Sequence, residues 1–180
     1  MNIPSIINRR SIRKFQNTPI EDEKLHAVLE AARWAPSGNN KQPARFIVVK
    51  SEEIRHALCQ ADHNQTWMMT APVFIVAVAD MTARVSADKS HPIDEQSPDW
   101  ELKRVIRDTA VAIGYLLLEA VNQGLGTCWT GFYTQSDVRP ILGLPEDKFV
   151  VGIIPIGYPA ENPEPRSRRP LNELVRYEKW

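Results

Sequence analysis

The sequence predicts helices packed on a central sheet, a fold of the α/β or α+β class. Short apolar runs of the length of a strand alternate with longer segments in which apolar residues recur at helical spacing. The chain has 180 residues, of which 43% are hydrophobic and 24% charged, as in an ordinary globular protein. We therefore expect residues 1–180 to form a single domain.

The first part of the chain is predicted to contain three helices and a strand. A short helix is expected over residues 4–8. A second begins near residues 20–23, whose acids favour the positive end of the helix dipole, and Pro36 ends it. A strand over residues 45–49 then precedes a short helix over residues 51–60.

The middle of the chain is dominated by two apolar segments. Residues 71–79 are continuously apolar, which is typical of a strand covered on both faces. Residues 80–98 are polar and contain Pro92 and Pro98, so we expect a mobile excursion or lid. A long helix follows over residues 99–122, and its middle is apolar nearly all round, as in a central helix.

In the last part of the chain, strands and helices are again predicted to alternate, and a tail without regular periodicity follows. An extended piece is expected over residues 127–133, followed by a helix that Ser136 caps and a strand over residues 149–158. Residues 159–180 contain four prolines and show no core periodicity. We expect this tail to be an arm rather than a packed element.

Charge and cysteine content exclude several classes of protein. Lys and Arg total 22, as do Asp and Glu, so no global field favours nucleic acid. Cys59 and Cys128 form neither a disulfide framework nor a zinc motif, and the four histidines lack the spacing of metal ligands. A secretory signal and an apolar run that could span a bilayer are not seen. We expect a cytoplasmic protein without a metal, a membrane segment or a nucleic-acid partner.

Two clusters of arginine and serine stand at opposite ends of this neutral chain. The first is RRSIRK, residues 9–14, and the second is RSRR, residues 166–169. Guanidinium groups match phosphate oxygens bidentately, and a serine hydroxyl donates one more bond. The two clusters therefore suit one phosphate, such as that of a nucleotide or flavin. The alternative is a pair of solvated basic turns.

A third polar stretch, APSGNNKQP at residues 35–43, lies between a predicted helix and a predicted strand. Such a stretch is often only a turn, because Asn and Gly tolerate unusual backbone angles. Glycine motifs of dinucleotide sites and phosphate loops are absent, as is the serine motif of hydrolases. The sequence thus offers phosphate ligands and amides without an obvious acid, base or nucleophile. Such a protein leaves the chemistry to a cofactor.

Four blocks of sequence together resemble the FMN-dependent nitroreductase family. In order they are RRSIRKF, APSGNNKQP, GLGTCWTGFY and GYPAENPEPRSRRPL, and they span nearly the whole chain. The resemblance implies an α+β fold with a central mixed, mostly antiparallel sheet flanked by helices. It also implies a homodimer that holds FMN at its interface, with the C-terminal arm extending onto the partner subunit.

The resemblance further implies which residues contact FMN. Arg9 and Ser11 would hold the phosphate and ribityl chain, and Arg13 would lie near the pyrimidine end of the ring. A backbone N–H at residues 130–131 would approach flavin N5. Part of the amide block would come from the partner subunit. The implied cofactor-binding residues are Arg9, Arg10, Ser11, Arg13, Pro36, Ser37, Asn40, Gln42, Trp129, Thr130, Gly131, Arg166 and Arg168.

Three positions are less clearly matched, or depart from the family. Asn64 corresponds loosely to an amide near the pyrimidine ring. Ala44 stands where an aromatic residue is common, and Trp67 stands near the position of a lysine in longer relatives. Trp129 is expected beside the ring, or else in the core.

The reaction implied by the resemblance has two steps. NADH or NADPH gives hydride to FMN N5 and leaves, and an acceptor such as a nitroaromatic or a quinone then enters the same cleft. The alternatives are another FMN reaction on this fold (dehydrogenation, dehalogenation or flavin breakdown) and a non-catalytic flavin-binding protein. An anion-binding or nucleic-acid-binding module would rest on the arginines alone, and the neutral charge argues against it.

Overall fold

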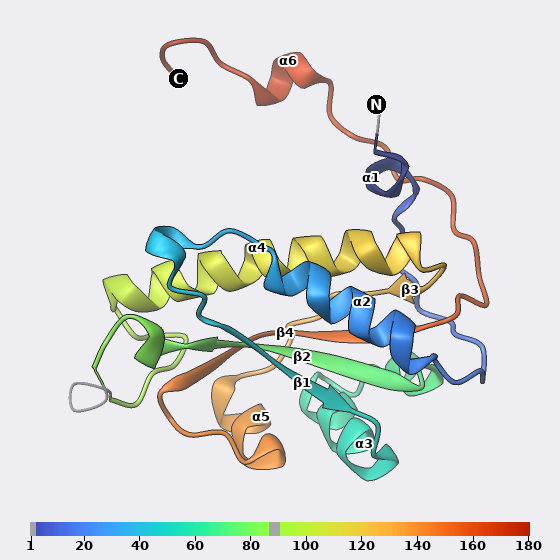
Figure 1. Ribbon diagram of the computed structural model, residues 1–180, viewed down its shortest axis with the longest axis horizontal. Helices are drawn as coiled ribbons and strands as arrows, with labels where there is room; N and C mark the ends of the chain where they lie inside the picture. The colour runs from blue at the N-terminus through green and yellow to red at the C-terminus, as the bar shows by residue number, and fades with distance from the viewer. Residues whose placement is uncertain (1–2, 87–90) are drawn as a thin grey trace.

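The computed structural model describes residues 3–86 and 91–180, which form a four-stranded sheet with helices on both faces (Figure 1). The strands lie in the order β1-β2-β4-β3, and the pairs in the described chain are antiparallel. A parallel contact is limited to a one-residue bridge between Ser11 and Thr127. The strands are β1 (Ala44–Val49), β2 (Val73–Asp80), β3 (Gly126–Thr127) and β4 (Lys148–Gly157).

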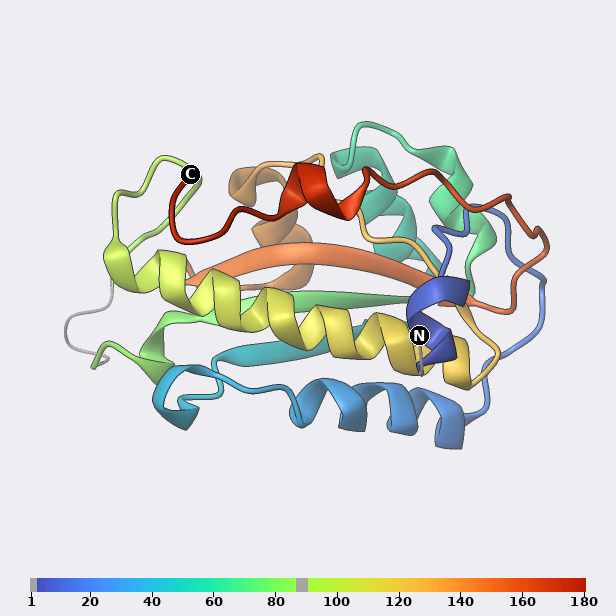
Figure 2. The same cartoon turned by 90° about the horizontal axis from the view of Figure 1, so that it is seen from above.

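Helices α2 and α4 cover one face of the sheet, and α3 and α5 cover the other, while α1 and α6 lie outside these layers (Figures 1 and 2). Short 3₁₀ turns lie at Gly38–Asn40 (η1), Thr66–Thr70 (η2) and Met81–Ala83 (η3). The helices are α1 (Pro4–Asn8), α2 (Asp22–Arg33), α3 (Glu52–Ala61), α4 (Trp100–Asn122), α5 (Gln135–Leu142) and α6 (Leu171–Leu174).

Strand β2 is apolar from Val73 to Ala79, and both of its faces are buried. Its alternate residues point to opposite sides of the sheet, as the period of a strand requires. Ile75 packs in the cluster that contains α2 and α4 residues, whereas Phe74 packs with Leu58 of α3 and Val138 of α5. The prediction of a strand covered on both faces is confirmed.

Helix α4 departs from the prediction of a central helix. Its inward face is buried at Val105, Ile113 and Leu116. On its outward face, Val111 and Tyr115 are 42% and 44% exposed. The apolar residues all round this helix are therefore covered on one side within a single chain.

Several predicted boundaries are corrected. Helix α2 ends at Arg33 rather than at Pro36. The residue that caps the N-terminus of α5 is Thr134 rather than Ser136, because Thr134 and Asp137 form a reciprocal capping box. In the extended piece at 127–133, regular pairing is confined to β3 and a bridge between Thr130 and Ile153.

The polar excursion at 80–98 is anchored by a buried residue on each side of the stretch that is not described. Met81 and Ile93 are buried, and both belong to a cluster with Leu102 and Val105 of α4. The Ile93 N–H donates to the Glu146 carbonyl at 3.0 Å. Residues 87–90 of the predicted lid lie outside the described residues.

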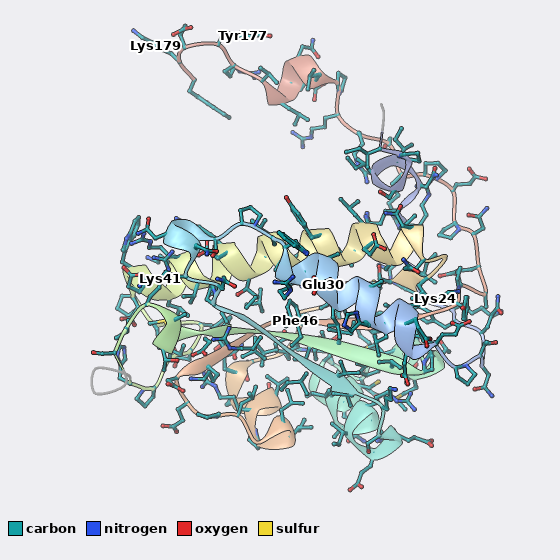
Figure 3. The ribbon with its side chains drawn as sticks, viewed as in Figure 1. Lys24, Glu30, Lys41, Phe46, Tyr177 and Lys179 are labelled. Atoms are coloured by element: carbon teal, nitrogen blue, oxygen red, sulfur yellow. The ribbon has the colours of Figure 1, made fainter. Side chains whose placement is uncertain are left out.

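The predicted arm leaves the body of the molecule after β4. Figure 3 shows Tyr177 and Lys179 on this tail, well separated from the sheet. The side chains of Tyr177 and Trp180 are exposed, as are those of Leu171 and Leu174 in α6. Among the helices that the structure describes, none is long and apolar enough to cross a membrane.

Candidate anion and cofactor site

Backbone pairing holds the N-terminal segment beside the exit of β4. Gln16 donates to the Tyr158 carbonyl, and Ala160 donates to the Lys14 carbonyl, each at 2.8 Å. The Arg13 N–H donates to a carboxylate oxygen of Glu161. Since residues 158–161 lead directly into the second arginine cluster, this pairing brings the two ends of the chain together.

A cavity of about 440 Å³ lies where the two arginine clusters meet. Among the described residues that line it, Glu164 is the single carboxylate against five arginines, so this lining carries net positive charge. The predicted convergence of both clusters on one site is therefore seen in the structure. The lining residues are Ile6, Ile7, Arg9, Arg10, Ser11, Arg13, Pro163, Glu164, Pro165, Arg166 and Arg168.

Three of these arginines are available to a ligand. The guanidinium groups of Arg9, Arg13 and Arg166 form no ion pair or hydrogen bond within residues 3–86 and 91–180, although Arg13 lies over the Trp67 ring at 5.7 Å. Arg10 differs. Its Nε donates to the Pro163 carbonyl at 3.2 Å, and its Nη1 donates to two carbonyls of its own segment. Arg10 therefore ties the tail to the N-terminal segment.

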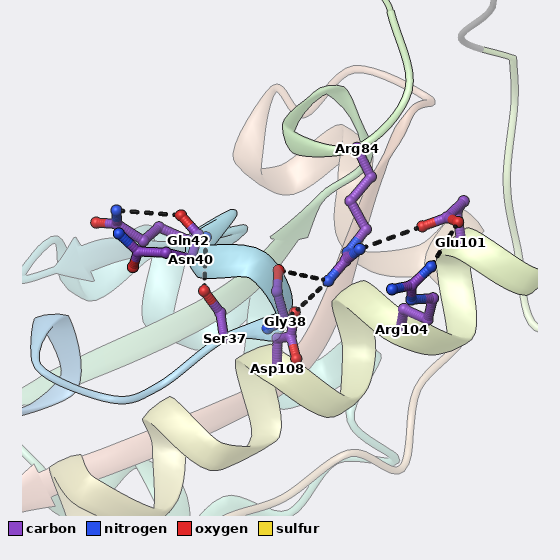
Figure 4. A network of polar contacts seen from close by, with 8 residues as sticks. All are labelled: Ser37, Gly38, Asn40, Gln42, Arg84, Glu101, Arg104 and Asp108. Carbon is purple, nitrogen blue, oxygen red and sulfur yellow. Dashed lines mark hydrogen bonds and ion pairs between the residues drawn. The ribbon is translucent and has the colours of Figure 1, made fainter.

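The amide block forms a left-handed turn at the other end of α4 (Figures 1 and 4). Asn39, Asn40 and Gln42 have positive φ angles of 54°, 52° and 48°. The Gln42 N–H donates to Ser37 Oγ at 2.8 Å. Asn tolerates this conformation better than most residues, which explains why amides gather here.

A buried arginine fixes the start of this turn (Figure 4). Arg84 Nη2 donates to the Gly38 carbonyl at 2.9 Å and to Asp108 Oδ2 at 3.1 Å. Asp108 Oδ2 in turn accepts from the Gly38 N–H at 3.2 Å. A Cβ at Gly38 would lie 2.4 Å from Arg84 Nη2, so a larger residue here would displace the Arg84 guanidinium from these bonds.

The amide block and the arginine cavity do not meet within one chain. Pro36, Ser37 and Gln42 line a separate cavity of about 320 Å³, which also includes Ala44 and Phe46. None of its lining residues lines the arginine cavity. A single chain thus presents two halves of the predicted site in two places.

The segment Trp129–Phe132, here called the strap, lies between β3 and α5. The Thr130 N–H donates to the Ile153 carbonyl at 3.0 Å, so it is not free for a ligand. Gly131 is exposed, and its N–H has no acceptor among the residues that the structure describes. The N–H expected at residues 130–131 is therefore available at Gly131. Trp129 is 41% exposed, and the predicted core alternative is not favoured.

Trp67 and Asn64 lie in the connection between α3 and β2. The Trp67 ring faces Arg13, and its Nε1 donates to Gln65 Oε1 at 3.0 Å. Asn64 has a positive φ of 54°. A flavin contact by either residue stays a prediction.

The thiol and phenol nearest the strap remain protonated. Burial raises the pKa of the Cys128 thiol, and Arg13 and Ser11 oppose this shift in part. Burial also raises the pKa of the Tyr133 phenol. Neither side chain supplies a thiolate or phenolate at neutral pH.

Sequence reasoning missed the buried and partly buried polar residues that support the site, among them Arg84, Asp108 and Asp62. Asp62 is fully buried and receives hydrogen bonds from the strap. A charged residue at the end of a helix carries no sign of its partners in the linear sequence. Its contacts are visible only once the fold places them.

Comparison with known proteins gives consistent matches over almost all of the chain. The sequence profile of the Nitroreductase family matches residues 6–65 and 55–158. An NADH dehydrogenase of Thermus thermophilus is 31% identical over 188 residues, covering 94% of this chain and 92% of that protein.

Two solved structures share the fold. The NADPH:FMN oxidoreductase of Vibrio harveyi, complexed with NAD⁺, is 29% identical with a TM-score of 0.88, covering 99% of this chain and 77% of that one. A protein of Desulfovibrio desulfuricans in complex with FMN is 28% identical with a TM-score of 0.82, covering 98% and 96%. These matches confirm the α+β fold class, while an arm on a partner subunit stays a prediction.

Arg84→Met tests the clamp on the amide turn. The change removes the cation that pairs with Asp108 and the donor to the Gly38 carbonyl, and we expect it to lower the free energy of unfolding by about 3 kcal/mol. Arg104→Met is the control, because Arg104 forms only a partly exposed ion pair with Glu101, for which we expect less than about 1 kcal/mol. Urea titration measures both, and equal losses would contradict the clamp.

Proposed function

The chain belongs to the nitroreductase family, and we propose that it is an NAD(P)H-dependent FMN oxidoreductase that reduces an organic acceptor such as a nitroaromatic or a quinone. The observation that carries this proposal is the cavity in which free arginines from both chain ends meet. A requirement for NADH or NADPH favours a cytoplasmic location.

The residues of the cavity fit FMN. Its phosphate is an anion with several acceptor oxygens, and charged guanidinium groups are its best-matched donors. Arg9 and Arg166 line the cavity from the two ends of the chain and hold no other partner in the described residues. Ser11 adds a hydroxyl from the same wall. We assign phosphate binding to these residues together with Arg168.

When bound, FMN supplies the redox chemistry by accepting hydride from NADH or NADPH at N5 and giving it to the acceptor. The chain supplies the electrostatics. Arg13 contributes a fixed positive charge, which stabilises negative charge that develops on the ring. Gly131 offers an exposed N–H donor. No titrating side chain is needed in these roles.

We propose a homodimer in which the amide turn of one subunit completes the arginine cavity of the other. Each chain exposes Val111 and Tyr115 on the outward face of α4, and also Ile3, Ile6 and Ile7 at the N-terminus. Apolar surface of this kind is usually covered by a partner. The amide turn and the arginine cavity lie apart in one chain, which supports a site shared between two.

Turnover tests the proposed function directly. The purified protein should be yellow or become so with added FMN, and NADH or NADPH should bleach the flavin before a nitroaromatic restores its colour. A flavin that binds but is not bleached would indicate another FMN reaction. Bleaching without turnover with nitroaromatics or quinones would indicate a flavin carrier, and failure to bind FMN would refute the proposal.

Arg9→Ala and Arg166→Ala test the shared phosphate site. Each removes a charged donor worth about 1.5–3 kcal/mol, so we expect the Kd for FMN to rise about 10-fold to 150-fold. Arg169→Ala is the matched control, since Arg169 lies in the same cluster but does not line the cavity. Fluorescence titration measures all three, and equal affinities for the three variants would contradict the assignment.

Val111→Asp combined with Tyr115→Asp tests the dimer. Two buried carboxylates at the proposed interface should convert the protein to a monomer that retains little FMN. Ile54→Asp, at an exposed apolar residue of α3, is the control and should remain a dimer with FMN. Light scattering with an absorbance spectrum gives both readouts. A wild-type monomer that holds FMN would rule out a shared site.

A further inference from the structure

Asp62 is a fully buried carboxylate at the C-terminal end of α3. It forms no ion pair with a cation in the described part of the chain. Burying a charge is unfavourable unless hydrogen bonds replace its water. The hydrogen bonds around this carboxylate therefore explain how it is accommodated in the protein interior.

Three donors converge on Asp62. Its Oδ1 accepts from the Phe132 N–H at 2.7 Å. Its Oδ2 accepts from Thr130 Oγ1 and from Gln65 Nε2, each at 2.5 Å. Gln65 Nε2 also lies 2.8 Å from Thr130 Oγ1, so the threonine hydroxyl accepts there and directs its proton to Asp62. An ionised carboxylate, which only accepts, satisfies the whole arrangement.

Contacts with Ile153 and His63, in addition to those with Asp62, hold the strap on both sides of Gly131. Before it, the N–H and carbonyl of Thr130 pair with Ile153 at 3.0 Å each. After it, the Phe132 carbonyl contacts His63 Nδ1, and the two rings stack with centroids 3.8 Å apart. The flanking residues are fixed through backbone and side chain. Gly131 between them is an exposed residue, and its N–H has no acceptor in the part of the chain that is described.

Among residues 3–86 and 91–180, no steric contact explains why residue 131 is glycine. Its φ angle does not lie in the left-handed region, and a Cβ placed there would meet no atom closer than Val151 O at 4.0 Å. By contrast, a Cβ at Gly152 would lie 2.2 Å from the Trp129 indole nitrogen. Glycine without an internal steric reason is typical of a backbone that a ligand approaches closely.

We propose that Asp62 is a positioning residue, which fixes the Gly131 N–H for flavin N5 and holds a negative charge close to the ring. This inference rests on the proposed FMN site. An N–H donor matches the lone pair of N5 in the oxidised ring but opposes the hydrogen that N5 carries after reduction. A nearby negative charge also opposes electron gain. Both effects lower the reduction potential of the bound flavin.

Asp62→Asn tests the proposal, because the amide keeps the shape but removes the charge and turns one acceptor into a donor. Two measurements are made. Hydrogen exchange of the strap in the FMN-free protein should accelerate at least about tenfold. The midpoint potential of bound FMN, from a spectroelectrochemical titration, should shift upward. The arginine cavity is untouched, so FMN should still bind.

Asp137→Asn is the matched control. It removes the same charge five residues beyond the strap, where Asp137 contacts Thr134 rather than the strap. The rate of hydrogen exchange in the strap and the midpoint potential of bound FMN should equal those of the wild type. Unchanged values in Asp62→Asn, or equal shifts in both variants, would overturn the proposal.

Two further outcomes are separable. If the wild type fails to bind FMN, the proposed function fails, while strap exchange still decides the positioning role of Asp62. If Asp62→Asn does not fold, Thr130→Val decides instead, since it removes a hydroxyl donor and keeps the charge. It should accelerate strap exchange and raise the potential less than the loss of charge would. Wild-type exchange in that variant would refute the proposal.

Discussion

Antiparallel pairing between the N-terminal segment and the chain leaving β4 holds the two ends of the molecule side by side. The hydrogen bonds of Gln16 and Ala160 fix this register, and the register brings the arginines of the two chain ends to one cavity. Five arginines facing one carboxylate repel each other unless an anion joins them. Because the fold holds the arginines together before a ligand binds, their mutual repulsion is already present in the ligand-free protein. An anionic cofactor relieves it, and the donors need no rearrangement on binding.

Two buried polar clamps complete the architecture at places where the backbone must take an unusual course. Arg84 and Asp108 hold the peptide of Gly38 from both sides, which starts the left-handed amide turn. Asp62 holds the strap that presents Gly131. In both cases a charged side chain on a helix, or at the end of a helix or 3₁₀ turn, binds backbone polar groups of a loop. The hydrophobic layers around the sheet give the fold its stability, and these clamps set the loops at the site.

Much of this could be predicted from the sequence, because hydrophobic periodicity reports directly on burial. The continuous apolar run of β2 predicted a strand with two covered faces, and the arginine clusters predicted a shared anion site. The clamps could not be predicted, since Asp62 and Thr130 are 68 residues apart and neither stands in a recognisable pattern. The apolar character of α4 was interpreted as burial in the centre of one chain. The structure leaves Val111 and Tyr115 exposed, and periodicity alone does not tell a core from a covered interface.

If arginines of both chain ends bind the cofactor phosphate, that phosphate must contribute strongly to affinity. This contribution is measured by comparing FMN with riboflavin, which lacks only that phosphate. Calorimetric titration of the flavin-free protein gives both affinities under one buffer. Two charged hydrogen bonds of about 1.5–3 kcal/mol each correspond to a preference for FMN of about 100-fold or more. We expect that preference, together with its weakening at high salt. Equal affinity for FMN and riboflavin would show that the arginines of the two chain ends do not bind the phosphate.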